Sequence, residues 1–117
     1  MIMDNDRKFL NMLGLCRKAG KLCLGHDAVM DSIARKKAYL VLLSSDSSKR
    51  LQRETTITIE KSGKDICVLF TAFTMKEIGL AVGKISAVLA VTDKNFASRL
   101  TELSGRNSIN DDKIQST

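Results

Sequence analysis

The spacing of apolar residues along the chain alternates between two periods. Phe9, Met12, Leu13 and Cys16 recur at the i, i+3, i+4 and i+7 positions of one helix face, which predicts a helix that stops at Gly20. The same spacing recurs in three later segments. Three further helices are therefore predicted, beginning near Asp27, Thr74 and Asp93.

Short apolar runs separate these helices and predict buried strands at residues 22–24, 39–43, 66–70 and 87–91. Residues 49–62 begin like a polar helix, but Thr and Ile alternate after Thr55 as they do in strands. We predict a helix over this segment, capped from the polar residues 44–48. Helices that alternate with strands indicate an α/β sandwich, in which a small sheet of about four strands is covered on both faces.

Length and composition predict one domain. A chain of 117 residues can bury a single core, which we expect within residues 1–105, and residues 106–117 have so little to bury that a flexible tail is expected. The apolar runs are too short to cross a bilayer, and the first residues resemble no secretory signal. We therefore expect a cytoplasmic protein that makes no membrane contact, and a monomer.

Charge is distributed unevenly along the chain. Residues 1–53 hold 11 Lys and Arg against 5 acids, whereas residues 54–117 hold 8 against 8, so the formal net charge of +6 belongs to the first half. Such asymmetry is typical of a surface that meets a polyanion, and it is equally compatible with a solvated basic face.

Candidate chemistry other than binding has little support. Cys16, Cys23 and Cys67 include no CxxC pair and lie among apolar neighbours, which predicts reduced, mostly buried thiols. Cys16 and Cys23 with His26, the only histidine, match no common zinc spacing. Neither nucleotide-binding glycine motif nor a nucleophile elbow is present, so we expect no metal, no cofactor and no catalytic residue.

The basic half does contain a candidate anion site. Gly20 and Lys21 precede the first short strand, and Gly25 precedes the second predicted helix. The first backbone N–H groups of a helix and the positive end of its dipole can hold a phosphate. Both glycines can also be plain structural stops.

Four segments together resemble a known family. LGLCRKAGKLCLGHDAV, ARKKAYLVLLSSDSS, TMKEIGLAVGK and VLAVTDKNFA follow one another in the order found in the L7Ae/L30e family of ribosomal proteins, in particular its bacterial YlxQ-like branch. The resemblance extends from about Phe9 to about Leu100. It implies a three-layer α/β/α sandwich around a small mixed sheet, in agreement with the predicted elements.

The resemblance also implies a function, the binding of structured RNA such as a kink-turn or ribosomal RNA. Family members place the helix start after AGKL in the widened groove of the kink, and they cover extruded bases with the loop before the last strand. Lys36 and Lys37 would touch phosphate only. The RNA-binding positions implied here are Lys18, Lys21, Gly25, His26, Asp27, Ala28, Val29, Asp31, Lys36, Lys37, Lys84, Ile85 and Ser86.

The chain departs from the family pattern at three of these positions. Kink-turn binders typically carry Gly-x-Asn-Glu-x-x-Lys, where this chain has Asp27, Ala28 and Asp31 in place of Asn, Glu and Lys. Asp27 accepts hydrogen bonds but donates none, and Ala28 does neither. We therefore expect altered RNA specificity, with a ribosome- or translation-associated protein-interaction module as the alternative function.

Overall fold

In the part of the chain that the structure describes, the central sheet has four strands in the order β1-β4-β2-β3. The structure, a computed structural model, describes residues 4–104. β2 pairs in parallel with β3, whereas β4 runs antiparallel to both of its neighbours, so the sheet is mixed. The strands are β1 (Leu22–Leu24), β2 (Leu40–Leu43), β3 (Cys67–Phe70) and β4 (Val88–Val91).

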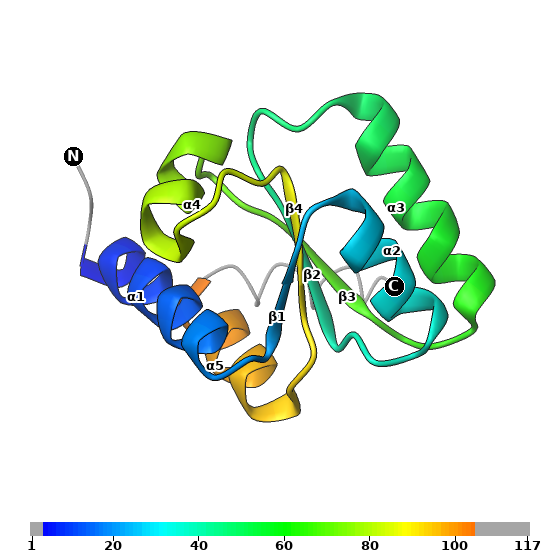
Figure 1. Ribbon diagram of the computed structural model, residues 1–117, viewed down its shortest axis with the longest axis horizontal. Helices are drawn as coiled ribbons and strands as arrows, with labels where there is room; N and C mark the ends of the chain where they lie inside the picture. The colour runs from blue at the N-terminus through cyan, green and yellow to red at the C-terminus, as the bar shows by residue number, and fades with distance from the viewer. Residues whose placement is uncertain (1–3, 105–117) are drawn as a thin grey trace.

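Within residues 4–104, five helices cover the two faces of the sheet (Figure 1), which confirms the predicted three-layer α/β/α sandwich. The helices are α1 (Asp4–Lys18), α2 (His26–Ala34), α3 (Lys49–Ser62), α4 (Met75–Val82) and α5 (Lys94–Ser104). In Figure 1, α1, α4 and α5 lie on one side of the sheet, and α2 and α3 lie on the other.

Each helical layer closes its own hydrophobic core, because successive residues of a strand point to opposite faces. Leu40 and Leu42 of β2 pack with α1, α4 and α5, whereas Val41 and Leu43 pack with α2 and α3. All four residues of β2 and all four of β4 are buried. The continuous apolar runs in the sequence are thus explained by two-sided burial. Tyr39, predicted at the start of the second strand, lies outside β2 and is exposed because the chain enters the sheet only at Leu40.

The ambiguous segment at residues 49–62 is helical throughout as α3. Thr55, Thr56 and Thr58 each donate a side-chain hydrogen bond to the carbonyl oxygen four residues earlier, at 2.8 to 3.0 Å. These bonds accommodate threonine in a helix, and burial of Thr55 against the sheet side outweighs the local preference for a strand. Ser48 caps the helix by accepting from the backbone N–H of Leu51, as predicted for the polar segment before it.

The predicted helix starts near Asp27, Thr74 and Asp93 are confirmed. Thr74 and Glu77 form the capping box at the start of α4, Gly83 ends α4 in the left-handed region, and Asp93 accepts from the backbone N–H of Phe96 in α5. The expected end of the domain at residue 105 and the expected tail at residues 106–117 lie outside the described residues.

The prediction that the thiols are mostly buried is wrong for one of them. Cys16 is buried and Cys23 is half-buried, but Cys67 is exposed, because it opens the edge strand β3. Cys16 donates to the carbonyl oxygen of Lys21 at 3.3 Å. Burial, with smaller contributions from the charges of Asp93 and Cys23, raises the pKa of the Cys16 thiol to about 12. Cys16 is therefore an inert core thiol.

Replacing Thr74 by Ala should lower the free energy of unfolding by about 1 kcal/mol, because the N–H of Glu77 loses the hydroxyl that it now meets at 3.2 Å. Urea denaturation measures the change. Thr74→Ser is the matched control and should retain most of the stability, since it keeps the hydroxyl. Equal losses in the two variants would mean that packing of the threonine methyl, not the cap, is responsible.

Candidate nucleic-acid interface

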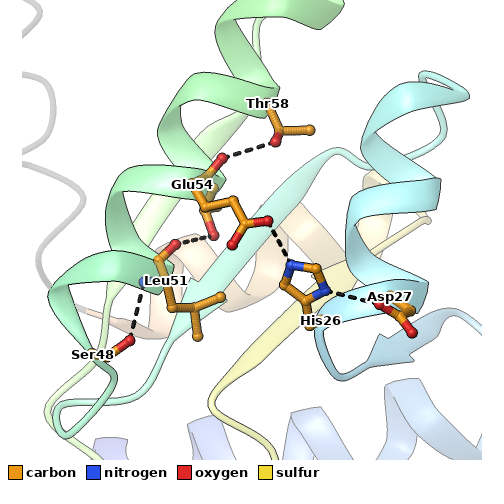
Figure 2. A network of polar contacts seen from close by, with 7 residues as sticks. His26, Asp27, Ser48, Leu51, Glu54 and Thr58 are labelled. Atoms are coloured by element: carbon orange, nitrogen blue, oxygen red, sulfur yellow. Dashed lines mark hydrogen bonds and ion pairs between the residues drawn. The ribbon is translucent and has the colours of Figure 1, made fainter.

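Three segments that are far apart in the sequence meet at one edge of the sheet. The backbone N–H of Gly25, just before α2, donates to the carbonyl oxygen of Val88 at the start of β4, at 3.0 Å. The first turns of α3 lie beside the start of α2 (Figure 2). We call this surface the binding edge, and it comprises residues 25–29, 49–54 and 84–88.

The start of α2 is open to a ligand. Gly25 has φ 90° and ψ 164°, a conformation that side chains rarely adopt, and it caps the helix without a side-chain hydrogen bond. Val29 donates the first backbone bond within the helix, to the carbonyl oxygen of Gly25 at 3.0 Å. The backbone N–H groups of the first turn therefore face outward at the positive end of the helix dipole.

His26 links the two helices at the binding edge (Figure 2). Its Nδ1 lies 2.9 Å from Oδ1 of Asp27, and its Nε2 lies 2.8 Å from Oε2 of Glu54 on α3. These hydrogen bonds, to Asp27 and then to Glu54, raise the pKa of His26 above its ordinary value of 6.5. A protonated imidazole donates from both nitrogens, so protonation strengthens the link.

The loop between α4 and β4 completes the binding edge. Lys84 and Ile85 are exposed, whereas Ser86 is buried. Gly79 of α4 holds this loop close, since a Cβ at that position would lie 2.9 Å from the Ile85 side chain and 3.1 Å from its Cα. Val29 is likewise fully buried, so Val29 and Ser86 can shape the edge but offer little side chain to a ligand.

Several of the other sequence-predicted positions lie away from this edge. The carbonyl oxygen of Lys21 accepts from the backbone N–H of Thr92, which follows β4 at the end opposite to Val88. The length of β1, about 13 Å at 3.3 Å per residue, separates Lys21 from Gly25. Lys36 and Lys37 follow the far end of α2, about 16 Å along the helix from Gly25. The basic residues of the first half therefore form no single patch.

Two more predicted positions have other neighbours. The exposed carboxylate of Asp31 accepts from the Nε of Arg35 at 3.0 Å, one turn further along α2. Lys18 is exposed at the end of α1, where it lines a hollow shared with α4. Within the described residues, no hydrogen bond or ion pair joins either side chain to His26, Asp27 or Glu54.

Sequence reasoning missed the contribution of α3. Glu54 contacts His26, and the exposed cations Lys49, Arg50 and Arg53 stand on the same first turns of the helix. These cations were counted in the basic half, but no local signal pairs residue 26 with residue 54. Their proximity comes from the packing of α2 against α3.

The described part of the chain offers no metal centre. Within residues 4–104, no group of three or more His, Cys, Asp or Glu side chains converges as ligands would. The same residues contain no helix that is both long enough and apolar enough to span a membrane.

The fold and the binding edge define a small α/β/α binding domain whose candidate ligand site is a helix start beside a loop. The chain belongs to the family described as "Ribosomal protein L7Ae/L30e/S12e/Gadd45 family", whose model matches residues 7–101. Two curated relatives, both called "RNA-binding protein YlxQ", identify the branch of the family. The resemblance to the YlxQ-like branch is thereby confirmed.

The relatives cover most of the chain. The Enterococcus faecium protein is 30% identical over 99 residues, which cover 85% of this chain and 93% of the relative. The Bacillus subtilis (strain 168) protein is 33% identical over 98 residues, which cover 79% of this chain and 90% of the relative. A Bacillus halodurans protein of unknown function has a TM-score of 0.75 at 27% identity, covering 84% of this chain and 97% of its own. A Giardia lamblia 15.5kD RNA binding protein has a TM-score of 0.68 at 16% identity, covering 91% of this chain and 89% of its own, and shows the shared fold.

The single histidine makes the link between α2 and α3 measurable by NMR. Because the pKa of His26 is raised on folding, its contribution to stability is fully present below about pH 6.5 and is lost as the pH rises through the folded-state pKa. Glu54→Gln should lower the pKa of His26 in a titration of its ring protons. The mutation should also reduce the free energy of unfolding more at about pH 6 than at about pH 8.5.

Glu60→Gln is the matched control, since Glu60 is an exposed carboxylate elsewhere on α3. It should leave the pKa of His26 unchanged. A pKa that responds equally to both changes would point to the overall charge of α3 and not to the 2.8 Å contact.

Proposed function

We propose that this protein is a non-catalytic, cytoplasmic, monomeric RNA-binding protein that recognises structured RNA of the kink-turn type or ribosomal RNA through the binding edge. The observation that carries the proposal is the juxtaposition of the uncapped start of α2 with the loop before β4 through the bond from Gly25 to Val88. These are the two segments that the family resemblance implies for RNA contact. The names of the curated relatives support the same class of ligand.

Phosphate contacts in this proposal come from backbone and cations. The outward N–H groups of the first turn of α2 meet one phosphate, and Lys84 with Lys49, Arg50 and Arg53 supplies charge on either side. Contacts of this kind position the nucleic acid without reading its sequence. Exposed Ile85 supplies an apolar surface for an unstacked base, which a bent RNA presents and a regular duplex does not.

Base reading is expected to differ from that of relatives with Asn and Glu. Asp27 projects fully into solvent beside His26 and can accept from a guanine or cytosine amine. Ala28, although exposed, offers no hydrogen bond. Asp27 and Glu54 also place negative charge near incoming phosphates, and a protonated His26 between them partly offsets that charge.

The same negative charge favours the alternative, a ribosome- or translation-associated module that docks on protein. Salt dependence separates the two functions. RNA binding through several phosphates weakens steeply as salt rises, whereas docking through an apolar patch does not.

A titration against a kink-turn RNA and a straight duplex of equal length, at low and at physiological salt, tests the proposal. Preference for the kink that survives physiological salt supports it.

Lysine variants test which surface the RNA occupies. Lys84→Ala should weaken binding of the kink-turn RNA about three- to tenfold and reduce the slope of log affinity against log salt by about 1, as expected for one lost phosphate contact. Lys37→Ala is the matched control, because this equally exposed lysine follows the far end of α2. A larger loss in Lys37→Ala than in Lys84→Ala would move the RNA site to the opposite end of the helix.

Restoring the family's glutamate tests the reading of bases. Ala28→Glu should improve discrimination of the kink-turn from the duplex by about 1–3 kcal/mol, since a carboxylate there can accept from base amines. Ala28→Gln keeps an acceptor without the charge and should give part of the gain. Competition titrations with the two RNAs measure the ratio. An unchanged ratio in both variants would mean that the first turn of α2 does not face the sheared base pairs.

A further inference from the structure

A second surface, distinct from the binding edge, runs between α1 and α4. Its hollow has a volume of about 780 Å³, and a smaller hollow of about 230 Å³ shares Leu10, Asn11, Leu80 and Ala81 with it. We call the two together the α1–α4 groove. From Arg7 to Lys18 the groove follows α1 for about 17 Å, which is about three helical turns.

Each of the two helices exposes a large apolar side chain to the groove. Leu80 leaves 82% of its surface in solvent and Leu15 leaves 52%, the two lining opposite sides of one hollow. Gly14 keeps the helices close, since a Cβ there would lie 3.0 Å from the carbonyl oxygen of Ala81. Large apolar side chains gathered around a concave surface are typical of an interaction site.

The charge around the groove is positive at one end. Arg17 and Lys18 line the larger hollow, and none of the other described residues around it is acidic. Arg17 already donates to the carbonyl oxygen of Val82, which fixes its guanidinium at the rim and leaves further N–H donors for a ligand. At the other end Arg7 lies with Glu77, whose carboxylate is engaged by the backbone N–H of Thr74.

We propose that the α1–α4 groove binds an amphipathic helix of a partner protein, whose apolar stripe meets Leu10, Leu15 and Leu80 and whose carboxylates meet Arg17 and Lys18. A helix fits because the groove is about three turns long and the described residues that line it come from α1, α4 and the glycine after α4, not from a strand edge. The proposal does not depend on RNA binding at the binding edge.

Two other occupants fit less well. Nucleic acid is held mainly by contacts to its phosphates, whereas the cations Arg7, Arg17 and Lys18 stand at the ends of the groove, with the exposed Leu15 and Leu80 between them. A second copy of this chain, using the same face, would bring Arg17 and Lys18 of both copies into a shared interface without acidic partners in the larger hollow.

The test uses the full chain and two synthetic helical peptides of about 14 residues. Both peptides carry leucines on one face, and one has Glu where the other has Lys. In fluorescence anisotropy titrations, the acidic peptide should bind at least about tenfold more tightly than the basic peptide. Equal affinities, or no binding of the acidic peptide, would overturn the proposal.

Matched variants locate the peptide on the protein. Leu80→Ser should weaken the acidic peptide about tenfold, whereas Ile57→Ser, on the exposed side of α3, should not. Lys18→Glu should shift preference toward the basic peptide, whereas Lys61→Glu on α3 should leave it unchanged.

Two further outcomes would assign the groove to another occupant and overturn the proposal. One is sedimentation of the free protein as a dimer that Leu80→Ser dissociates. The other is a pair of results: kink-turn RNA displaces the peptide from the wild-type protein, and the Leu80→Ser variant no longer binds that RNA. Because Leu80 is outside the binding edge, retained RNA binding in this variant keeps the two surfaces separate.

Discussion

The pairing of β4 between β1 and β2 is the interaction on which the candidate RNA surface depends. Both neighbours run antiparallel to β4, so the start of β4 faces the ends of β1 and β2. At this end, the carbonyl oxygen of Val88 accepts from the backbone N–H of Gly25, which follows β1, and the carbonyl oxygen of Ala87 accepts from that of Ser44, which follows β2. Without β4 between β1 and β2, the start of α2 and the loop after α4 would not be held side by side at the binding edge. Complete burial of β2 and β4 makes the arrangement rigid.

Electrostatics at this edge is a balance of opposed signs. The helix dipole, Lys84 and the α3 cations attract phosphate, while Asp27 and Glu54 repel it. His26 stands between the two carboxylates, whose hydrogen bonds raise its pKa above 6.5, and its protonation adds one positive charge to the edge. The edge is thus less cationic than the total charge of the protein suggests.

Local signals in the sequence were sufficient for most of the fold. Thr74 and Glu77 of the capping box are three positions apart, and Phe9 and Cys16 at the ends of the apolar stripe of α1 are seven positions apart, so both patterns can be read within a short stretch of sequence. The site was predicted less completely. Gly25 and Ile85 lie on one edge as the family resemblance implied, but the separation of Lys21 from Gly25 follows from the direction of β1, and the contact of His26 with Glu54 spans 28 residues. Cys67 looked like a core residue because edge position is a property of the sheet order, which no short pattern encodes.

The threonine-rich helix α3 has a consequence for the chain before it is folded. Residues 55–59, TTITI, combine high strand propensity with no charge, and packing on α2 and the sheet, together with the threonine side-chain hydrogen bonds, holds them helical. In the native molecule the strand next in sequence, β3, is an edge strand with Phe70 exposed. A nascent chain that has not yet buried α3 therefore carries two segments able to join in cross-strand association with other copies. Arg53 and Glu54 before the segment, and Glu60 and Lys61 after it, act as charged gatekeepers that slow such self-association.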